Sequence, residues 1–192
     1  MTILLRFALI GLVGTLTGLA ATYTLLQRSP AFGAIKAGPW LVAPKTGSAD
    51  IDPYSRAQLA RTGEIPLAHA EGLSFMARTD SAGGRLDSHC TYVLSGPVPE
   101  SRYWSLTLVS PSGTLAKNPA ERYGFTSAEI VRAADGSFEI TVARNARSGN
   151  WLPAPTPHAF GLVLRLYDTL LDFSTSKLDE SALPRIAKVA CK

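Results

Sequence analysis

The sequence begins with a stretch that carries no charged side chain between Arg6 and Arg28. Its roughly 20 apolar or small residues would form a helix long enough to cross the ~30 Å hydrocarbon core of a bilayer. A helix is expected because it satisfies every backbone N–H and C=O group within the segment. We therefore predict a transmembrane anchor within residues 1–28. A cleaved signal peptide is the alternative, since residues 18–20 have the small-x-small pattern of a cleavage site.

The flanks of this stretch do not decide its orientation, because Arg6 lies on one side and Arg28 and Lys36 on the other. Within it, Gly14 and Gly18 form a G-x-x-x-G pair. That spacing lets two transmembrane helices approach closely, so a homo-oligomer is one assembly that the sequence allows.

Cys90 and Cys191 are the two cysteines of the chain. In an exported domain such a pair is most simply a disulfide, which predicts a bacterial periplasmic domain behind an inner-membrane anchor. Two free buried thiols are the alternative. Asp87, His89 and Cys90 stand close together, but no second ligand pair at the usual spacing accompanies them. We therefore predict no metal site, and no cofactor.

Beyond residue 72 the apolar residues recur with period two. The pattern is clearest at Trp104, Leu106 and Leu108 and again in residues 136–143 and 159–167. Alternation of this kind, in short runs separated by turns, is typical of an antiparallel β-sandwich or barrel.

A short, weakly amphipathic helix is expected after Asp52, because Asp is a favourable N-cap and Gly63 suits the end of the helix. The composition divides the chain into three parts. Residues 1–28 would be the anchor, the Pro/Gly/Ala-rich residues 29–49 a linker, and residues 50–192 a β-sandwich domain.

Six segments occur in an order that resembles one bacterial family of unknown function, DUF1214: "IDPYSRAQLAR", "RYWSLTLVSPSG", "NPAERYGF", "GNWLPAP", "LRLYD" and "LPRI". They span roughly residues 38–191. The resemblance implies a jelly-roll-like β-sandwich. In longer relatives this domain follows a DUF1254 domain in the same chain, so a separate partner chain of the DUF1254 family is implied here.

Catalysis has little support in the sequence. No G-x-S-x-G nucleophile motif is present, since "EGLSFM" has Met76 at the position of the second glycine. The acidic residues show no spacing that singles out a catalytic pair, and neither a phosphate-binding loop nor a dinucleotide fingerprint occurs. An envelope hydrolase, carboxylesterase-like or glycan-acting and using His89 or His158 with a nearby carboxylate, is the alternative function.

The favoured function is binding of a partner protein or an envelope component. Nucleic acid is an unsuitable ligand, because the net charge of +4 comes from scattered residues. The candidate binding residues combine aromatic faces with hydrogen-bonding groups: Asn118, Arg122, Tyr123, Asn150 and Trp151. Trp151 lies in "SGNWLPAP", which reads as a loop. Its rigid setting would suit either a plug over one end of the sandwich or a platform for a ligand.

Overall fold

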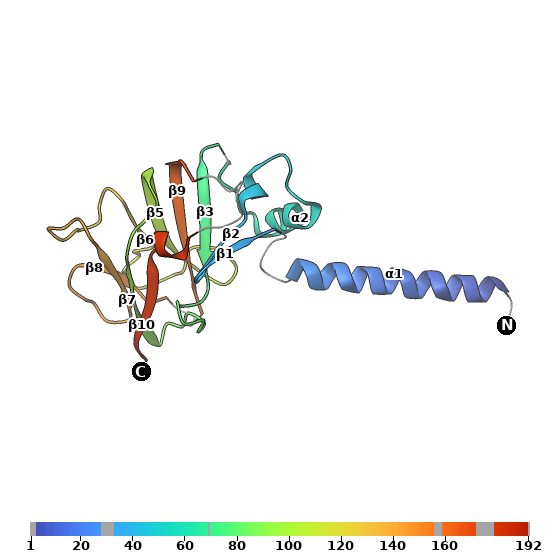
Figure 1. Cartoon of the computed structure of the whole chain (residues 1–192). Coiled ribbons are helices and arrows are strands. Elements are labelled where there is room, and N and C mark those ends of the chain that lie inside the picture. The colour runs from blue at the N-terminus through green and yellow to red at the C-terminus, as the bar shows by residue number, and fades with distance from the viewer. Residues whose placement is uncertain (1–2, 28–32, 69, 156–158, 172–178, 192) are drawn as a thin grey trace.

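The computed structural model describes residues 3–27, 33–68, 70–155, 159–171 and 179–191. The chain is mainly β, with two packed sheets, one long N-terminal helix and one short helix (Figure 1). The predicted fold class is therefore confirmed.

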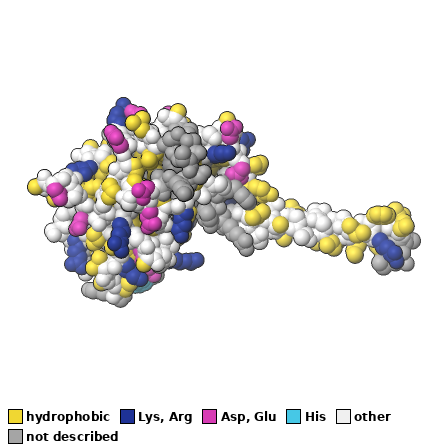
Figure 2. Space-filling model, viewed as in Figure 1, with side chains coloured by type: hydrophobic (Ala, Val, Ile, Leu, Met, Phe, Trp, Pro, Cys, Tyr) yellow, Lys and Arg dark blue, Asp and Glu magenta, His cyan; other side chains and the backbone are white. Residues whose placement is uncertain are grey.

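The N-terminal helix α1 (Ile3–Gln27) projects away from the sheets (Figure 1). Its segment Ile3–Leu26 has a mean hydropathy of 2.0 and no part of it is buried against the domain. Hydrophobic side chains are visible along its surface (Figure 2). The helix is thus long and apolar enough to cross a membrane.

The larger sheet has six antiparallel strands in the order β1-β2-β3-β9-β5-β6. The strands are β1 (Ile35–Ala37), β2 (Trp40–Val42), β3 (Gly72–Ala77), β9 (Gly161–Thr169), β5 (Ser101–Val109) and β6 (Gly124–Thr126).

The smaller sheet has four strands in the order β10-β4-β7-β8. They are β10 (Arg185–Cys191), β4 (Cys90–Ser95), β7 (Glu139–Ala143) and β8 (Asn150–Pro153). β7 and β8 pair in parallel, whereas the other pairs are antiparallel. The long strands β3, β4, β5, β7, β9 and β10 alternate between the sheets, as the strands of a jelly roll do.

The core lies between the two sheets. It contains the apolar residues whose period-two alternation predicted the strands. Trp104, Leu106 and Leu108 of β5 are at most 5% exposed. Two ring contacts join the layers: Trp104 stacks on Phe138 at 5.3 Å, and Tyr92 meets Phe160 edge-on at 5.9 Å. Such pairs contribute about 0.5–1.5 kcal/mol beyond the area that they bury.

Part of the predicted linker is instead structured. Residues 35–42 form a hairpin, and β2 pairs with β3, so the sheet extends into the segment predicted to be a linker. The side chain of Trp40 holds this hairpin against the domain. It is 1% exposed, and its indole N–H donates to the Pro184 carbonyl at 2.7 Å. The hairpin is followed by a 3-10 helix, η1 (Pro44–Gly47).

The short helix α2 (Pro53–Thr62) begins and ends as expected. The carboxylate of Asp52 accepts hydrogen bonds from the Tyr54 and Ser55 backbone N–H groups. Gly63 ends the helix at φ 68°, which a residue with a Cβ rarely adopts. A second 3-10 helix, η2 (Glu180–Ala182), precedes β10.

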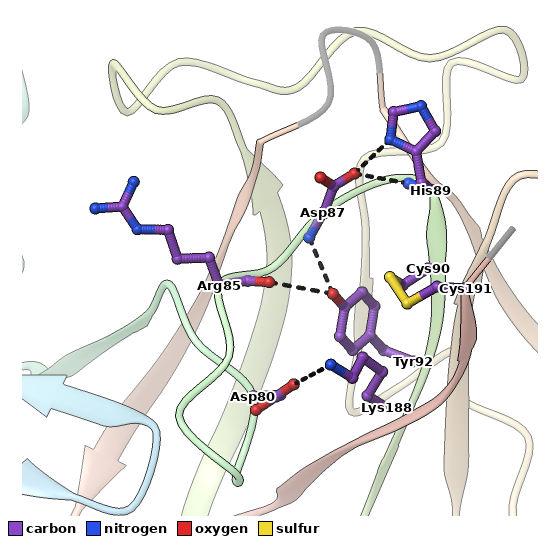
Figure 3. The surroundings of a disulfide bond; sticks show 8 residues. All are labelled: Asp80, Arg85, Asp87, His89, Cys90, Tyr92, Lys188 and Cys191. Atoms are coloured by element: carbon purple, nitrogen blue, oxygen red, sulfur yellow. Dashed lines mark hydrogen bonds and ion pairs between the residues drawn. A yellow bond between two sulfur atoms is a disulfide. The ribbon is translucent and has the colours of Figure 1, made fainter.

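The predicted disulfide joins Cys90 to Cys191. The two residues are direct partners in the ladder between β4 and β10, so the bond fastens the last strand to its neighbour (Figure 3). It closes a loop with a sequence separation of 101 residues.

Candidate functional site

Asn118 holds a turn together with its own amide group. Its Nδ2 donates to the carbonyls of Ala116 and Arg122 at 3.2 and 2.9 Å, and its Oδ1 accepts from the Arg122 backbone N–H at 3.1 Å. The residue is 8% exposed. Its hydrogen-bonding capacity serves the backbone of the loop before β6.

Asn150 does the same at the start of β8. Its Oδ1 accepts from the Val131 N–H at 2.8 Å, and its Nδ2 donates to the carbonyls of Val131 and Glu139 at 2.8 and 2.9 Å. The side chain thus ties the 131 region to the edge of the smaller sheet. The segment 148–155, which read as a loop, contains this strand because Asn150 to Pro153 pair with β7.

Trp151 and Arg122 are brought together. The half-buried indole of Trp151 donates to the Ala143 carbonyl at 2.9 Å, and its backbone carbonyl accepts from Arg122 Nη1 at 3.3 Å. The Arg122 guanidinium also lies over the Phe125 ring at 5.7 Å. Tyr123 follows Arg122 and is partly buried. Trp151 alternates along β8 with the fully buried Leu152, and Arg122 is exposed, so both interpretations of Trp151, plug and platform, stay predictions.

The disulfide end of the sandwich carries the residues of the hydrolase alternative. His89 Nδ1 lies 2.8 Å from Asp87 Oδ1 (Figure 3). Ser88 between them is 1% exposed, so its hydroxyl is inaccessible to a substrate. His158 lies outside the described residues, as does His69. Within the described ranges, no three His, Cys, Asp or Glu side chains gather closely enough to hold a metal ion.

Tyr92 fixes the backbone of residues 85–87, next to the pair formed by His89 and Asp87. Its hydroxyl accepts from the Asp87 N–H at 3.0 Å and donates to the Arg85 carbonyl at 3.3 Å (Figure 3). Burial raises the pKa of the Tyr92 hydroxyl, and the nearby Asp80 and Asp87 carboxylates act in the same direction. The group therefore stays protonated and acts as a structural link.

A cleft of about 680 Å³ lies elsewhere, on the outer face of the larger sheet. Its floor comes from β2 and β3, one wall from α2, and another from the turn at residues 111–114. The lining combines apolar side chains with polar and charged ones, and includes Leu41, Leu59, Leu67, Met76, Ser55 and Ser74. A smaller hollow of about 250 Å³ shares Met76 and continues across the sheet to Val163 and Arg165 on β9.

Two arginines border this cleft. Arg78 Nη1 donates to the Pro111 carbonyl at 3.1 Å, which fixes the turn that forms one wall. Arg61, near the end of α2, donates from Nη2 to the Leu26 carbonyl of α1 at 3.2 Å. The cleft therefore lies beside the end of α1, as the position of α2 in Figure 1 also indicates.

The sequence did not predict the cleft, because three segments far apart in the chain build it. One feature of the sequence was nevertheless a signal for the cleft. Ser74 and Met76 alternate with the buried Leu73, Phe75 and Ala77 of β3, so they occupy the face expected to contact water. An apolar Met76 on that face indicated that something covers it.

Comparison with protein families finds one family model that matches the central part of the chain. The model of the family described as "Protein of unknown function (DUF1214)" matches residues 71–170. The chain belongs to the DUF1214 family. The match runs from the start of β3 to the end of β9, which is narrower than the span of 38–191 over which the sequence resembles the family. α2 and the β1–β2 hairpin, which complete the cleft, lie outside the matched residues.

Two solved structures resemble the DUF1214 chain. The VPA0106 protein from Vibrio parahaemolyticus superposes with a TM-score of 0.58 at 22% identity, covering 93% of this chain and 44% of that one. An uncharacterized protein from Burkholderia cenocepacia gives a TM-score of 0.44 at 19% identity, covering 91% and 50%. The chain thus spans half or less of the length of these proteins. The first likeness shows the fold, and no curated protein matches the chain.

Proposed function

We propose that this DUF1214 protein is a membrane-anchored, non-enzymatic binding domain displayed in the bacterial periplasm. Its ligand is an envelope component, and the cleft between β3 and α2 is the binding site. The observation that carries the proposal is the cleft itself. Its volume of about 680 Å³ falls within the ~300–1,000 Å³ typical of ligand sites, and its lining offers both apolar contact and hydrogen-bonding groups to a ligand.

The location rests on two features. Helix α1 has the length and hydropathy of a membrane span. The Cys90–Cys191 disulfide needs an oxidising compartment to form and persist. Together they support an inner-membrane anchor with the sheets on the periplasmic side.

Ligand retention by the full-length protein tests this proposal. The purified chain, in detergent, would be exposed to a solvent extract of cell envelopes and washed, and the retained compounds would be identified by mass spectrometry. Ser74→Trp fills the cleft from β3, while Thr141→Trp adds the same bulk to a partly buried position of the smaller sheet. We expect a compound that the wild type and Thr141→Trp retain and that Ser74→Trp does not. Equal retention by all three proteins would contradict the proposal.

A second candidate is docking of a separate partner chain of the DUF1254 family. The length of the VPA0106 protein supports it, because this fold accounts for 44% of that chain. The partner chain would supply the counterpart of the rest of that protein. Crosslinked pull-down of the tagged chain from its native membranes should recover that partner. Recovery of this chain alone would count against docking.

The hydrolase alternative uses His89 or His158 with a nearby carboxylate; His158 lies outside the described residues, and His89 pairs with Asp87. Burial of Ser88 leaves that pair without an accessible adjacent serine. Labelling with a serine-reactive fluorophosphonate tests this directly. We expect no labelling of the purified full-length protein, and stoichiometric labelling would favour the hydrolase instead.

A further inference from the structure

We propose that the occupant of the cleft is a phospholipid of the surrounding bilayer, with one acyl chain inside the cleft and the headgroup at its arginine-lined rim. The inference rests on the proposed function, since it names the ligand of the same site. The lipid enters sideways from the membrane rather than from solution.

The first argument is position. Arg61 lines the cleft and also donates to the carbonyl of Leu26, which is the last residue of the membrane-length segment of α1. Arg61 therefore lies at the level where the hydrocarbon core ends. Ser55, which also lines the cleft, is six residues earlier on α2, about 9 Å along the helix axis. The cleft thus begins at the bilayer surface.

The second argument is the rim. Ile65, in the loop that follows α2, borders the smaller hollow next to the cleft. Its side chain is large and apolar, yet it is 89% exposed. A large aliphatic side chain at this level is stabilised by insertion among lipid chains, whereas in water it is hydrated at a cost. A bilayer in contact with Ile65 would bring lipid directly to the opening of the cleft.

The third argument is chemistry. Apolar side chains from β2, α2, the loop after α2 and β3 line the space, and each is only partly buried by the protein: Leu41, Leu59, Leu67 and Met76. An acyl chain that enters from the bilayer is already out of water, so the gain comes from covering these side chains, which are otherwise hydrated. Met76 suits such a flexible ligand because its unbranched side chain adapts its shape.

The charged side chains that line the cleft suit the phosphate of a lipid headgroup. Arg61 and Arg78 line the cleft, against one acidic residue, Glu64. The Arg78 guanidinium has one nitrogen bonded to the Pro111 carbonyl, while its Nε lies buried with no hydrogen-bond partner among the described residues. Arginine at the boundary between hydrocarbon and water favours an anionic phospholipid headgroup.

Photocrosslinking tests the proposal on the full-length chain in vesicles of phosphatidylethanolamine and phosphatidylglycerol. A trace of phosphatidylglycerol would carry a diazirine near the end of one acyl chain, and the crosslinked peptides would be mapped by mass spectrometry. We expect adducts on α1, which lipid surrounds, and a second group of adducts on the peptides that contain Leu59 or Met76.

Cleft-filling variants separate bound lipid from bulk lipid. Two substitutions fill the cleft: Ser74→Trp on its floor and Gln58→Trp on the wall formed by α2. Each should lower the cleft adducts about tenfold, equivalent to about 1.4 kcal/mol of binding, and leave the α1 adducts unchanged. The matched controls are Thr141→Trp and Ala57→Trp, the latter at an exposed position of α2 that does not line the cleft. Both should crosslink as the wild type does. Circular dichroism confirms that each variant is folded.

The outcomes are distinguishable. Adducts confined to α1 would overturn the lipid assignment. If Ser74→Trp then still abolished retention of a compound from the envelope extract, the cleft would remain a ligand site with another occupant, such as a soluble glycan or a peptide of a partner chain. If the variant changed neither readout, both the lipid and the proposed binding function would be wrong.

Discussion

Asn150 gives the sharpest prediction, because the sequence assigned it to ligand binding and the structure gives it three backbone partners. Replacement by alanine leaves the N–H and C=O of Val131 and the C=O of Glu139 without their hydrogen bonds. A net value of about 1 kcal/mol for each bond gives a loss of about 3 kcal/mol. For a domain of this size that corresponds to a fall of about 6–12 °C in melting temperature.

Urea unfolding of the full-length protein in detergent measures this loss. Tryptophan fluorescence reports on the β domain alone, because the three tryptophans, Trp40, Trp104 and Trp151, lie outside α1. Ser148→Ala, at an exposed position two residues earlier, is the control and should change the free energy of unfolding by less than about 0.5 kcal/mol. An Asn150→Ala protein as stable as this control, but unable to bind its ligand, would refute the structural role and restore the binding role.

Four further predictions follow from the same contacts. Trp151→Ala should lower the melting temperature by several degrees, whereas Trp151→Phe, which loses mainly the bond to Ala143, should cost about 1 kcal/mol. Stability should fall as pH rises through the raised pKa of Tyr92, above its usual 10.0, because the folded state holds that proton more tightly; alkaline titration of Tyr92→Phe should lack this step. Replacing both cysteines by serine should lower the free energy of unfolding by up to ~4.7 kcal/mol in urea titrations, since the bond closes a loop of 101 residues. Gly14→Leu should abolish any crosslinked dimer in membranes without altering the monomer, because a Cβ at Gly14 meets no atom of the described chain within 4 Å.

The sequence predicted the elements whose signals are local. The alternation of Trp104, Leu106 and Leu108 matched the buried face of β5, because a strand that buries one face must repeat with period two. Asp52 and Gly63 marked the ends of α2 for equally local reasons, namely the cap geometry at each terminus.

The features that the sequence missed depend on contacts between distant residues. The β1–β2 hairpin has the composition of a linker, and its place in the sheet comes from the pairing of residues 40–42 with residues 75–77. The parallel pairing of β8 depends likewise on its register with β7. Neither relationship leaves a pattern within the segment itself.

The predicted binding residues and the cleft are different places in the structure, since none of those residues lines the cleft. Polar side chains among aromatic ones suggested a ligand surface, but Asn118 and Asn150 direct their amides to backbone groups. An amide that satisfies a buried turn has the same local sequence as one that awaits a ligand. The cleft needed β2, β3, α2 and residues 111–114 together, so only the tertiary structure could reveal it.

The most direct test of the account is the redox state of the two cysteines in living cells. Cells would be quenched with acid, and the extracted protein would be treated with a mass-tagged alkylating agent with and without prior reduction. We predict no tag without reduction and one tag on each of Cys90 and Cys191 after it. Tagging of both cysteines in the unreduced sample would place the domain in a reducing compartment and contradict the periplasmic assignment.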